Sequence, residues 1–284
     1  MIDQIKTIAV AGAGAMGAGI AQVFAQAGYE VKLYDVNAAQ LDKAKAGIAD
    51  NLQKAVAKNK LPEKDKDNAF ALIRYTSDVN TLKADLIVEA IVEKIEIKRE
   101  LFTKLAAING DTTILASNTS SLPITQIASG IPHPERVVGM HFFNPAHIMQ
   151  LVEVISGAET SAEVLETMKS LTTKIGKTLV VAKDSPGFIV NRVARHYYVE
   201  SLRILEERAT TMENADALME SAGFKMGPFK LMDALGNDVN FAVTSSLFNA
   251  FHQDPKFRPS RIQQQKVDAG HLGKKSGRGF YSYE

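Results

Sequence analysis

The chain has 284 residues, 45% of them hydrophobic, which is enough for one large domain or two smaller ones. Its formal net charge of +1 indicates no general attraction to nucleic acid or to an anionic membrane. Because cysteine is absent, disulfides, thiol chemistry and thiolate metal sites are excluded, and no metal site is expected. Met1-Ile-Asp leads directly into the first predicted strand and leaves no room for a signal or transit peptide, so we expect a soluble cytoplasmic protein.

The first 34 residues predict a strand, a glycine turn, a helix and a second strand. Residues 5–10 form a mostly apolar run typical of a buried strand, and it breaks on a Gly-x-Gly-x-x-Gly sequence. Strand, glycine turn and helix are the context that the dinucleotide fingerprint requires. The phosphates of a dinucleotide would lie at the helix N-terminus, where free N–H groups favour negative charge. We expect five residues of this segment to bind the cofactor: Gly12, Gly14, Ala15, Met16 and Gly17.

The second strand, residues 29–34, ends on an acidic residue that selects the cofactor. Asp35 lies 35 − 17 = 18 residues after Gly17, close to the spacing of about 20 that the fold requires. A carboxylate there accepts both ribose hydroxyls of NAD and repels the extra phosphate of NADP. Without Asp35, a glycine turn in some other α/β protein would explain the motif; with it, we predict NAD.

Residues 7–29 carry no charge and pass the crude length test for a membrane span. They include five glycines and two glutamines, so their mean hydropathy is too low for a span. No membrane contact is expected.

Residues 38–60 follow Asp35 and predict one long helix with a lysine-rich face that includes Lys58. A solvated helix face explains the lysines. The alternative is that an anionic substrate tail lies across them. Residues 63–67 predict a charged connector.

Strands and helices then alternate, which predicts an α/β fold with a doubly wound, mostly parallel sheet of the Rossmann type. Ligands in such sheets bind beyond the carboxyl ends of the strands. Polar residues occur at the predicted ends, at Glu89, Glu93, 117–121, His141 and Asn144. The predicted strands are 74–77, 85–91, 112–117, 136–141, 151–155 and 178–182, with helices at 93–107 and 162–175.

From residue 188 onward the pattern is almost entirely helical, with helices expected at 188–207, 214–222, 229–235 and 239–251. We place the boundary near Pro186, giving a first domain at 1–185 and a smaller all-α domain at 186–284. Several apolar helix faces in the second domain favour a homodimer, although ordinary core packing would use the same residues.

Hydride transfer to a nicotinamide also needs a base that takes the hydroxyl proton. His141 is the best candidate, because it ends a strand on the cofactor side and imidazole titrates near neutral pH. Glu153, on the next strand, would hold the other ring nitrogen. From spacing alone, a structural histidine beside a surface glutamate is equally compatible with the pattern.

The sequence resembles the (S)-3-hydroxyacyl-CoA dehydrogenase family over nearly its whole length. The motifs that carry the resemblance occur in the family's order: residues 12–22, 88–93, 116–121, 139–145, 184–192, 227–229 and 277–281. The resemblance implies reversible hydride transfer between NAD and position 3 of a short acyl-CoA, such as 3-hydroxybutyryl-CoA.

The resemblance also implies roles for individual residues. His141 matches the catalytic base, Glu153 its partner, and Ser120 and Asn191 the residues that bind the reacting end of the substrate. Lys58 matches a lysine that meets the CoA tail, and Asn51 stands where animal enzymes of the family have a serine touching CoA. The matches on the cofactor side are Glu93, Lys98, Asn118, Asn144 and Lys275.

Two other functions remain open from the sequence. Related two-domain dehydrogenases act on free hydroxyacids, and some use a lysine as acid/base; Lys183 near the boundary would be the candidate. A cofactor-binding protein without turnover is the other alternative, and the intact set of four polar residues at 120, 141, 153 and 191 argues against it.

Overall fold

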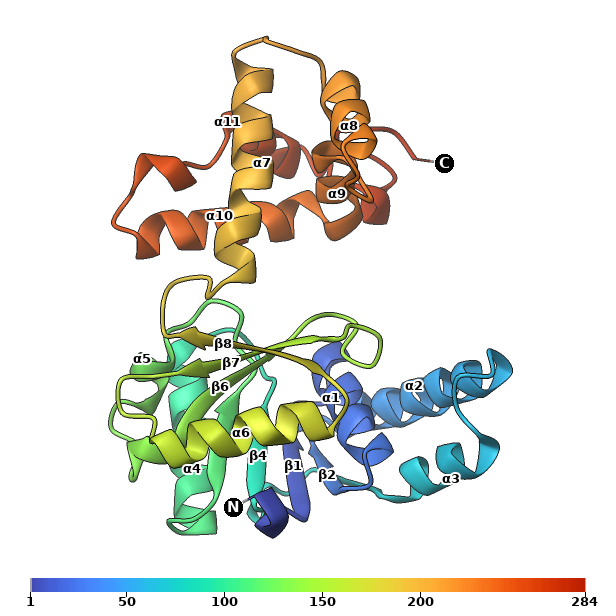
Figure 1. Ribbon diagram of the computed structural model, residues 1–284, viewed down its shortest axis with the longest axis vertical. Coiled ribbons are helices and arrows are strands. Elements are labelled where there is room, and N and C mark those ends of the chain that lie inside the picture. The colour runs from blue at the N-terminus through green and yellow to red at the C-terminus, as the bar shows by residue number, and fades with distance from the viewer. Residues whose placement is uncertain (1, 284) are drawn as a thin grey trace. The chain divides into compact units, whose positions relative to one another are not determined.

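The computed structural model describes residues 2–283. The chain forms two compact units, Met1–Ser185 and Pro186–Glu284, and each is described by itself (Figure 1). Among the described residues, no helix is both long enough and apolar enough to cross a membrane.

The first unit is built on one sheet with the strand order β3-β2-β1-β4-β5-β6-β7-β8 within the described chain. All neighbouring strands are parallel except β6 and β7, which are antiparallel. The carboxyl ends of β1 to β6 therefore meet at one edge of the sheet. The strands are β1 (Thr7–Ala11), β2 (Glu30–Tyr34), β3 (Ile73–Thr76), β4 (Leu86–Glu89), β5 (Ile114–Ser117), β6 (Val137–Phe142), β7 (Leu151–Ser156) and β8 (Thr178–Lys183).

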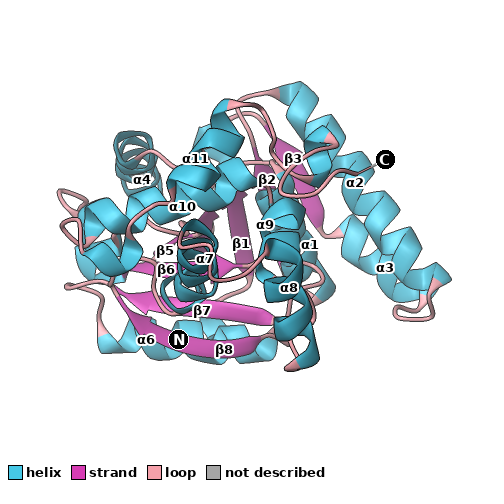
Figure 2. Ribbon diagram, turned by 90° about the horizontal axis from the view of Figure 1, so that it is seen from above, coloured by secondary structure: helices cyan, strands magenta, loops and turns pink. Residues whose placement is uncertain are grey.

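The right-handed crossover rule explains which face each helix covers. Across the sheet, the step from β1 to β2 and the step from β4 to β5 run in opposite directions. The helices that make these two connections, α1 (Ala15–Gln26) and α4 (Ile95–Asn109), therefore lie on opposite faces of the sheet. The reversed direction of β7 and β8 returns α6 to the face of α1, and these two helices share one apolar cluster with the strands. Figure 2 shows α6 lying along β7 and β8. The helices are α1 (Ala15–Gln26), α2 (Ala38–Ala57), α3 (Glu63–Ala71), α4 (Ile95–Asn109), α5 (Ile124–Ala128) and α6 (Ala162–Lys174).

Two glycines of the first loop are required by packing within the protein. A Cβ on Gly17 would lie 1.7 Å from the carbonyl oxygen of Gly12, so α1 approaches the end of β1 more closely than any side chain permits. Gly12 has φ +104°, and its Cβ would lie 2.6 Å from the carbonyl oxygen of Ala90. Both residues let β1, α1 and the end of β4 pack together.

The charged connector expected at residues 63–67 is wrong, because this segment begins helix α3. Pro62 precedes the first turn, and Glu63 and Asp65 lie within that turn, where negative charge stabilises a helix. The helix buries Ala69 and is otherwise polar, so it lacks the apolar periodicity that predicts a helix.

The second unit packs its helices around a small apolar core that includes Tyr198, Leu202, Phe229, Met232 and Phe280. Its helices are α7 (Val190–Glu206), α8 (Met212–Ser221), α9 (Pro228–Leu235), α10 (Asn237–Ala250) and α11 (Arg261–Asp268).

The C-terminal segment of this unit folds onto a buried carboxylate. Asp233 of α9 accepts hydrogen bonds from the backbone N–H groups of Phe280 and Tyr281 and from the Tyr283 hydroxyl, each at 2.9 Å. A Cβ on Gly279 would lie 2.0 Å from the Asp233 carboxylate, so the glycine allows this close approach. The Gly-x-Gly-Phe-Tyr sequence at 277–281 thus has a folding reason.

Candidate functional site

The glycine loop leaves open space at its middle glycine. A Cβ on Gly14 would meet no atom within 4 Å, in contrast to Gly12 and Gly17. Gly14 is also the N-cap of α1 and provides no side-chain cap for the first turn. The protein itself therefore does not require glycine at residue 14, whereas a pyrophosphate approaching the backbone at this helix terminus would.

Asp35 lies at the carboxyl end of β2 beside this loop. Its carboxylate accepts hydrogen bonds from the backbone N–H groups of Ala13 at 2.8 Å and Asn37 at 2.9 Å. The side chain of Gln40, on α2, donates to the carbonyl oxygen of Ala13 at 2.9 Å. This hydrogen bond links α2 to the glycine loop. Asp35 is thus fixed in orientation, next to the loop that would hold the pyrophosphate.

A cavity of about 450 Å³ lies against Asp35 and Gly14. Its remaining wall is largely apolar, with Val36, Ile91 and Ile97 among the lining residues. A carboxylate at one side of an apolar cavity suits an adenosine group, whose ribose hydroxyls donate to the carboxylate while the base packs on aliphatic side chains. The residues present therefore fit a dinucleotide.

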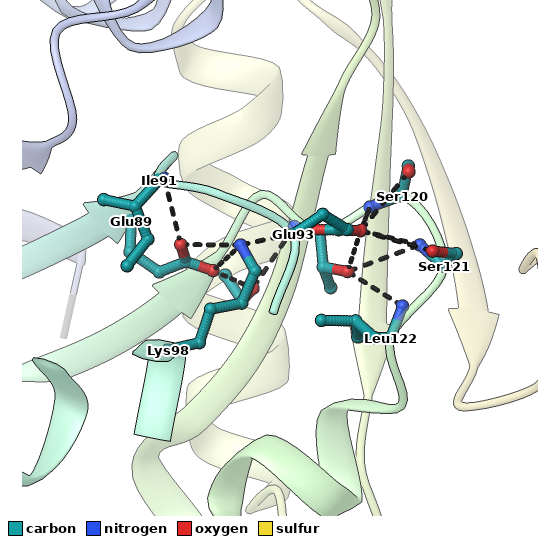
Figure 3. A network of polar contacts seen from close by, with 9 residues as sticks. Glu89, Ile91, Glu93, Lys98, Ser120, Ser121 and Leu122 are labelled. Atoms are coloured by element: carbon teal, nitrogen blue, oxygen red, sulfur yellow. Dashed lines mark hydrogen bonds and ion pairs between the residues drawn. The ribbon is translucent and has the colours of Figure 1, made fainter. Parts of the chain in front are cut away.

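Beyond β4, a buried ion pair underlies the loop that follows β5 (Figure 3). The Lys98 ammonium donates to both oxygens of Glu89 at 2.8 Å, and the Lys98 and Glu89 side chains are 1% and 0% exposed. Burial raises the pKa of Glu89, while Lys98 and the Ser117 hydroxyl act in the opposite direction. Lys98 also pairs with Glu93 at 3.2 Å. Lys98, which is expected on the cofactor side, is buried in ion pairs with Glu89 and Glu93.

Glu93 joins the loop after β4 to the loop after β5. Its Oε1 accepts hydrogen bonds from the Thr119 hydroxyl at 2.6 Å and from the backbone N–H of Ser120 at 2.9 Å, and the hydroxyls of Ser120 and Ser121 also donate to it (Figure 3). Burial alone would raise the pKa of Glu93, but Lys98 and these donors together hold the pKa below its ordinary value. The ionised carboxylate therefore sets the position of Ser120.

His141 and Glu153 form a buried pair on β6 and β7. They are register partners of the antiparallel ladder, and His141 Nδ1 lies 2.8 Å from Glu153 Oε2. The Glu153 side chain is fully buried and that of His141 is 7% exposed. Because a carboxylate only accepts, Nδ1 carries the donated proton, which assigns Nε2 as the acceptor nitrogen of the neutral ring.

A hydrogen bond also links the end of β6 to the residue that follows β5. The Asn118 side chain accepts a hydrogen bond from the backbone N–H of Phe142 at 2.8 Å. Asn118 was expected to face the cofactor; this contact holds the strand that carries His141.

The other expected residues lie in three places. Asn51 and Asn144 line a second cavity, of about 340 Å³, and Lys58 is the C-cap of α2. Asn191 and Lys275 belong to the second unit, Asn191 in the first turn of α7 and Lys275 in an ion pair with Asp238 at 2.7 Å.

The sequence predicted no role for Gln40, and it marked Ser117 only as one of the polar residues at a strand end. Gln40 is one of several polar residues on a solvated helix, and only the fold brings it to Ala13. Ser117 donates to Glu89, a residue 28 positions earlier in the chain. No local sequence pattern predicts either of these hydrogen bonds.

These features define a dinucleotide-binding α/β protein with a buried histidine–glutamate pair near the carboxyl edge of its sheet. Comparison with family models identifies which one. Residues 7–185 match the NAD-binding domain of 3-hydroxyacyl-CoA dehydrogenase, and residues 187–283 match the C-terminal domain of the same enzyme. The chain belongs to the 3-hydroxyacyl-CoA dehydrogenase family, a family of NAD-dependent oxidoreductases, and its cofactor is NAD.

Individual relatives agree with this assignment. A 3-hydroxyadipyl-CoA dehydrogenase of Escherichia coli is 49% identical over the whole chain, which spans 60% of that relative's length. A 3-hydroxybutyryl-CoA dehydrogenase of Mycobacterium tuberculosis is 38% identical over the full length of both proteins. The crystal structure of (S)-3-hydroxybutyryl-CoA dehydrogenase from Ralstonia eutropha has a TM-score of 0.95 at 38% identity, covering 99% of this chain and 100% of that one.

The buried pair of Glu89 and Lys98 generates a stability prediction. Lys98→Met would leave the Glu89 carboxylate buried without its cation, so we expect a loss of about 3–5 kcal/mol in the free energy of unfolding. The double variant E89M/K98M removes both charges and should recover most of this loss. Urea unfolding of the three proteins measures both values, and a Lys98→Met protein as stable as the wild type would contradict the assignment.

Proposed function

We propose that this protein is an NAD-dependent (S)-3-hydroxyacyl-CoA dehydrogenase that interconverts short 3-hydroxyacyl-CoA and 3-oxoacyl-CoA esters, with 3-hydroxybutyryl-CoA and acetoacetyl-CoA as the pair to test. The observation that carries the proposal is the buried contact between His141 and Glu153. Membership of the family and the activities after which its relatives are named support the substrate class.

His141 acts as the acid/base. In the oxidising direction, Nε2 takes the proton of the substrate's 3-hydroxyl group, and the C3–H bond gives its electron pair as hydride. NAD, when bound, is the hydride acceptor. In the reducing direction, His141 returns the proton to the oxygen of the 3-oxo group. A positioned base of this kind contributes about 10²- to 10⁴-fold to the rate.

Glu153 is a positioning residue for His141. Its carboxylate fixes the ring orientation and offsets the positive charge that appears when Nε2 takes a proton. The complete burial of the Glu153 side chain strengthens this interaction, because charges interact more strongly away from bulk water.

Ser120 and Asn191 are assigned to the oxygens at the reacting end of the substrate. Support for Ser120 comes from its fixed backbone, which donates to Glu93 at 2.9 Å. Support for Asn191 comes from the family motif at 184–192. The CoA tail is assigned to Asn51 and Lys58 on α2.

Replacing His141 tests the proposal directly. The change His141→Gln keeps a polar side chain but removes the base, so we expect kcat to fall by about 10²- to 10⁴-fold while the Kd for NADH stays the same. Glu153→Gln should lower kcat as well. Initial rates of acetoacetyl-CoA reduction and a fluorescence titration with NADH supply the two readouts.

The chain offers a matched control. His133 and Glu135 form an exposed histidine–glutamate pair, with the nitrogen and oxygen 3.2 Å apart. His133→Gln removes the same chemical group from an exposed position and should leave kcat within about twofold of the wild type. An active His141→Gln protein would disprove the role of His141.

We also propose a cytoplasmic homodimer that forms through the second unit. Large apolar side chains of this unit are exposed, among them Leu218 at 69%, Phe224 at 51% and Leu235 at 51%. Covering such residues with a second copy would remove apolar surface from water. Sedimentation equilibrium at micromolar concentration should give twice the chain mass, and the mass of a single chain would refute the dimer.

A further inference from the structure

The second unit buries an arginine that no carboxylate of the described chain pairs with. Arg195, on α7, is 4% exposed, and its hydrogen bonds within the described chain go to uncharged acceptors. Burial lowers the pKa of the Arg195 guanidinium to about 10, so the group remains charged at neutral pH. A buried charge is costly unless an opposite charge compensates it. The buried Lys98 of the first unit, by contrast, pairs with two glutamates.

Within the described chain, the fold uses only one nitrogen of this guanidinium. Nη1 donates to the carbonyl oxygen of Asn240 at 2.9 Å and to the Thr244 hydroxyl at 2.8 Å, which links α7 to α10. Nε is buried without a hydrogen-bond partner, and Nη2 donates to no group of residues 2–283. Nε and Nη2 carry the two parallel N–H groups that can bind both oxygens of one carboxylate. The fold therefore uses neither donor of this fork.

Neighbouring side chains hold the guanidinium in place and add a donor. The Tyr198 ring lies over the guanidinium, with its centroid 4.7 Å from the Cζ atom of Arg195. Gln263, on α11, donates to the amide oxygen of Asn240 at 3.0 Å. The amide nitrogen of Asn240 is then a buried donor without a partner in the described chain. A fixed cation beside further donors suits an anionic ligand.

Arg195 lies one helical turn from the residue assigned to the reacting end of the substrate. Asn191 and Arg195 are four residues apart on α7, so their side chains leave the same side of the helix, about 6 Å apart along its axis. Helix α10 runs beside this stretch. A Cβ on Gly187, just before α7, would lie 2.6 Å from Leu247 Cδ2, and Thr244 contacts Arg195. A substrate group that extends from Asn191 along α7 would therefore reach Arg195.

This spacing sets the length of the ligand. Three bonds of an extended chain span about 3.5 Å, and a hydrogen bond adds about 2.9 Å. A carboxylate three carbons beyond the reacting carbon therefore covers about one helical turn. The acyl chain of acetoacetyl-CoA ends one carbon beyond the reacting carbon and is too short to reach Arg195.

We propose that Arg195 binds a carboxylate at the far end of the acyl chain, so that the preferred substrates are CoA esters of dicarboxylic acids. Nε and Nη2 donate to the two carboxylate oxygens, and the amide nitrogen of Asn240 is the further donor. Hydride and proton move as in the proposed function, on which this inference rests. Arg195 determines specificity and takes no part in the chemistry.

Two substrates of equal chain length test the inference. 3-Oxoadipyl-CoA ends in a carboxylate at carbon 6, whereas 3-oxohexanoyl-CoA ends in a methyl group there. The wild type should reduce 3-oxoadipyl-CoA with a kcat/KM about 10- to 100-fold higher, which is the effect of hydrogen bonds between charged groups. Arg195→Met keeps a long side chain without its charge. It should abolish this preference and leave the KM for acetoacetyl-CoA close to the wild-type value.

The readout and two further variants control for effects on folding. The ratio of the two kcat/KM values does not depend on how much of a preparation is folded, so lower stability of Arg195→Met does not obscure the result. Arg195→Lys keeps the charge without the fork and should retain part of the preference. Arg203→Met is the matched control, because Arg203 lies on the same helix in a partly exposed pair with Glu200 at 3.4 Å. This variant should leave the ratio unchanged.

The outcomes separate this inference from the proposed function. If the wild type reduces both six-carbon substrates equally well, or if Arg195→Met keeps the preference, the inference is overturned and the proposed function stands. Buried water is the alternative partner of the fork, because the acceptor Oε1 of Gln263 is also buried without a partner in the described chain. That alternative predicts no preference for the carboxylate. If the wild type reduces no 3-oxoacyl-CoA, the proposed function fails and the inference falls with it.

Discussion

The antiparallel pairing of β6 with β7 is the constraint on which the site depends. In this pairing His141 and Glu153 are register partners, so the carboxylate lies directly opposite the imidazole and 2.8 Å from Nδ1. A shift of one residue would turn Glu153 to the other face of the sheet. Because the carboxylate is fully buried, leaving Glu153 unpaired would lower the free energy of unfolding by several kcal/mol. The strand register and the histidine–glutamate pair therefore stabilise each other. Asn118, which follows β5, also accepts a hydrogen bond from the backbone N–H of Phe142 at the end of β6.

Close packing within the protein requires some glycines of this chain and not others. Gly12, Gly17 and Gly279 are required by the protein itself, because a Cβ at each would overlap a neighbouring atom. Gly14 and Gly47 meet no such neighbour, although Gly47 weakens its helix. Gly12 and Gly14 both line the cavity beside Asp35, so this cavity is bounded by one glycine that packing within the protein requires and by one that it does not.

Much of the fold was predictable from sequence, because parallel strands buried on both faces give continuous apolar runs and the dinucleotide motif has a fixed spacing. The helices that were missed lack local signals. Helix α5 has its first two N–H groups bound by Asp184, about 60 residues later in the chain, and α11 buries a polar residue, Gln263. The role of Lys98 was also unpredictable, because its partner Glu89 becomes visible only when β4 and α4 pack together.

The central claim is that this chain transfers hydride between NADH and the 3-oxo group of an acyl-CoA. The most direct measurement is the absorbance of reduced nicotinamide when the protein is mixed with acetoacetyl-CoA and either NADH or NADPH. The account predicts rapid loss of NADH and little loss of NADPH, because the Asp35 carboxylate repels the 2′-phosphate. Rapid loss of NADPH would contradict the role of Asp35. Loss of neither cofactor, with acetoacetyl-CoA and with longer 3-oxoacyl-CoA esters, would contradict the claim itself.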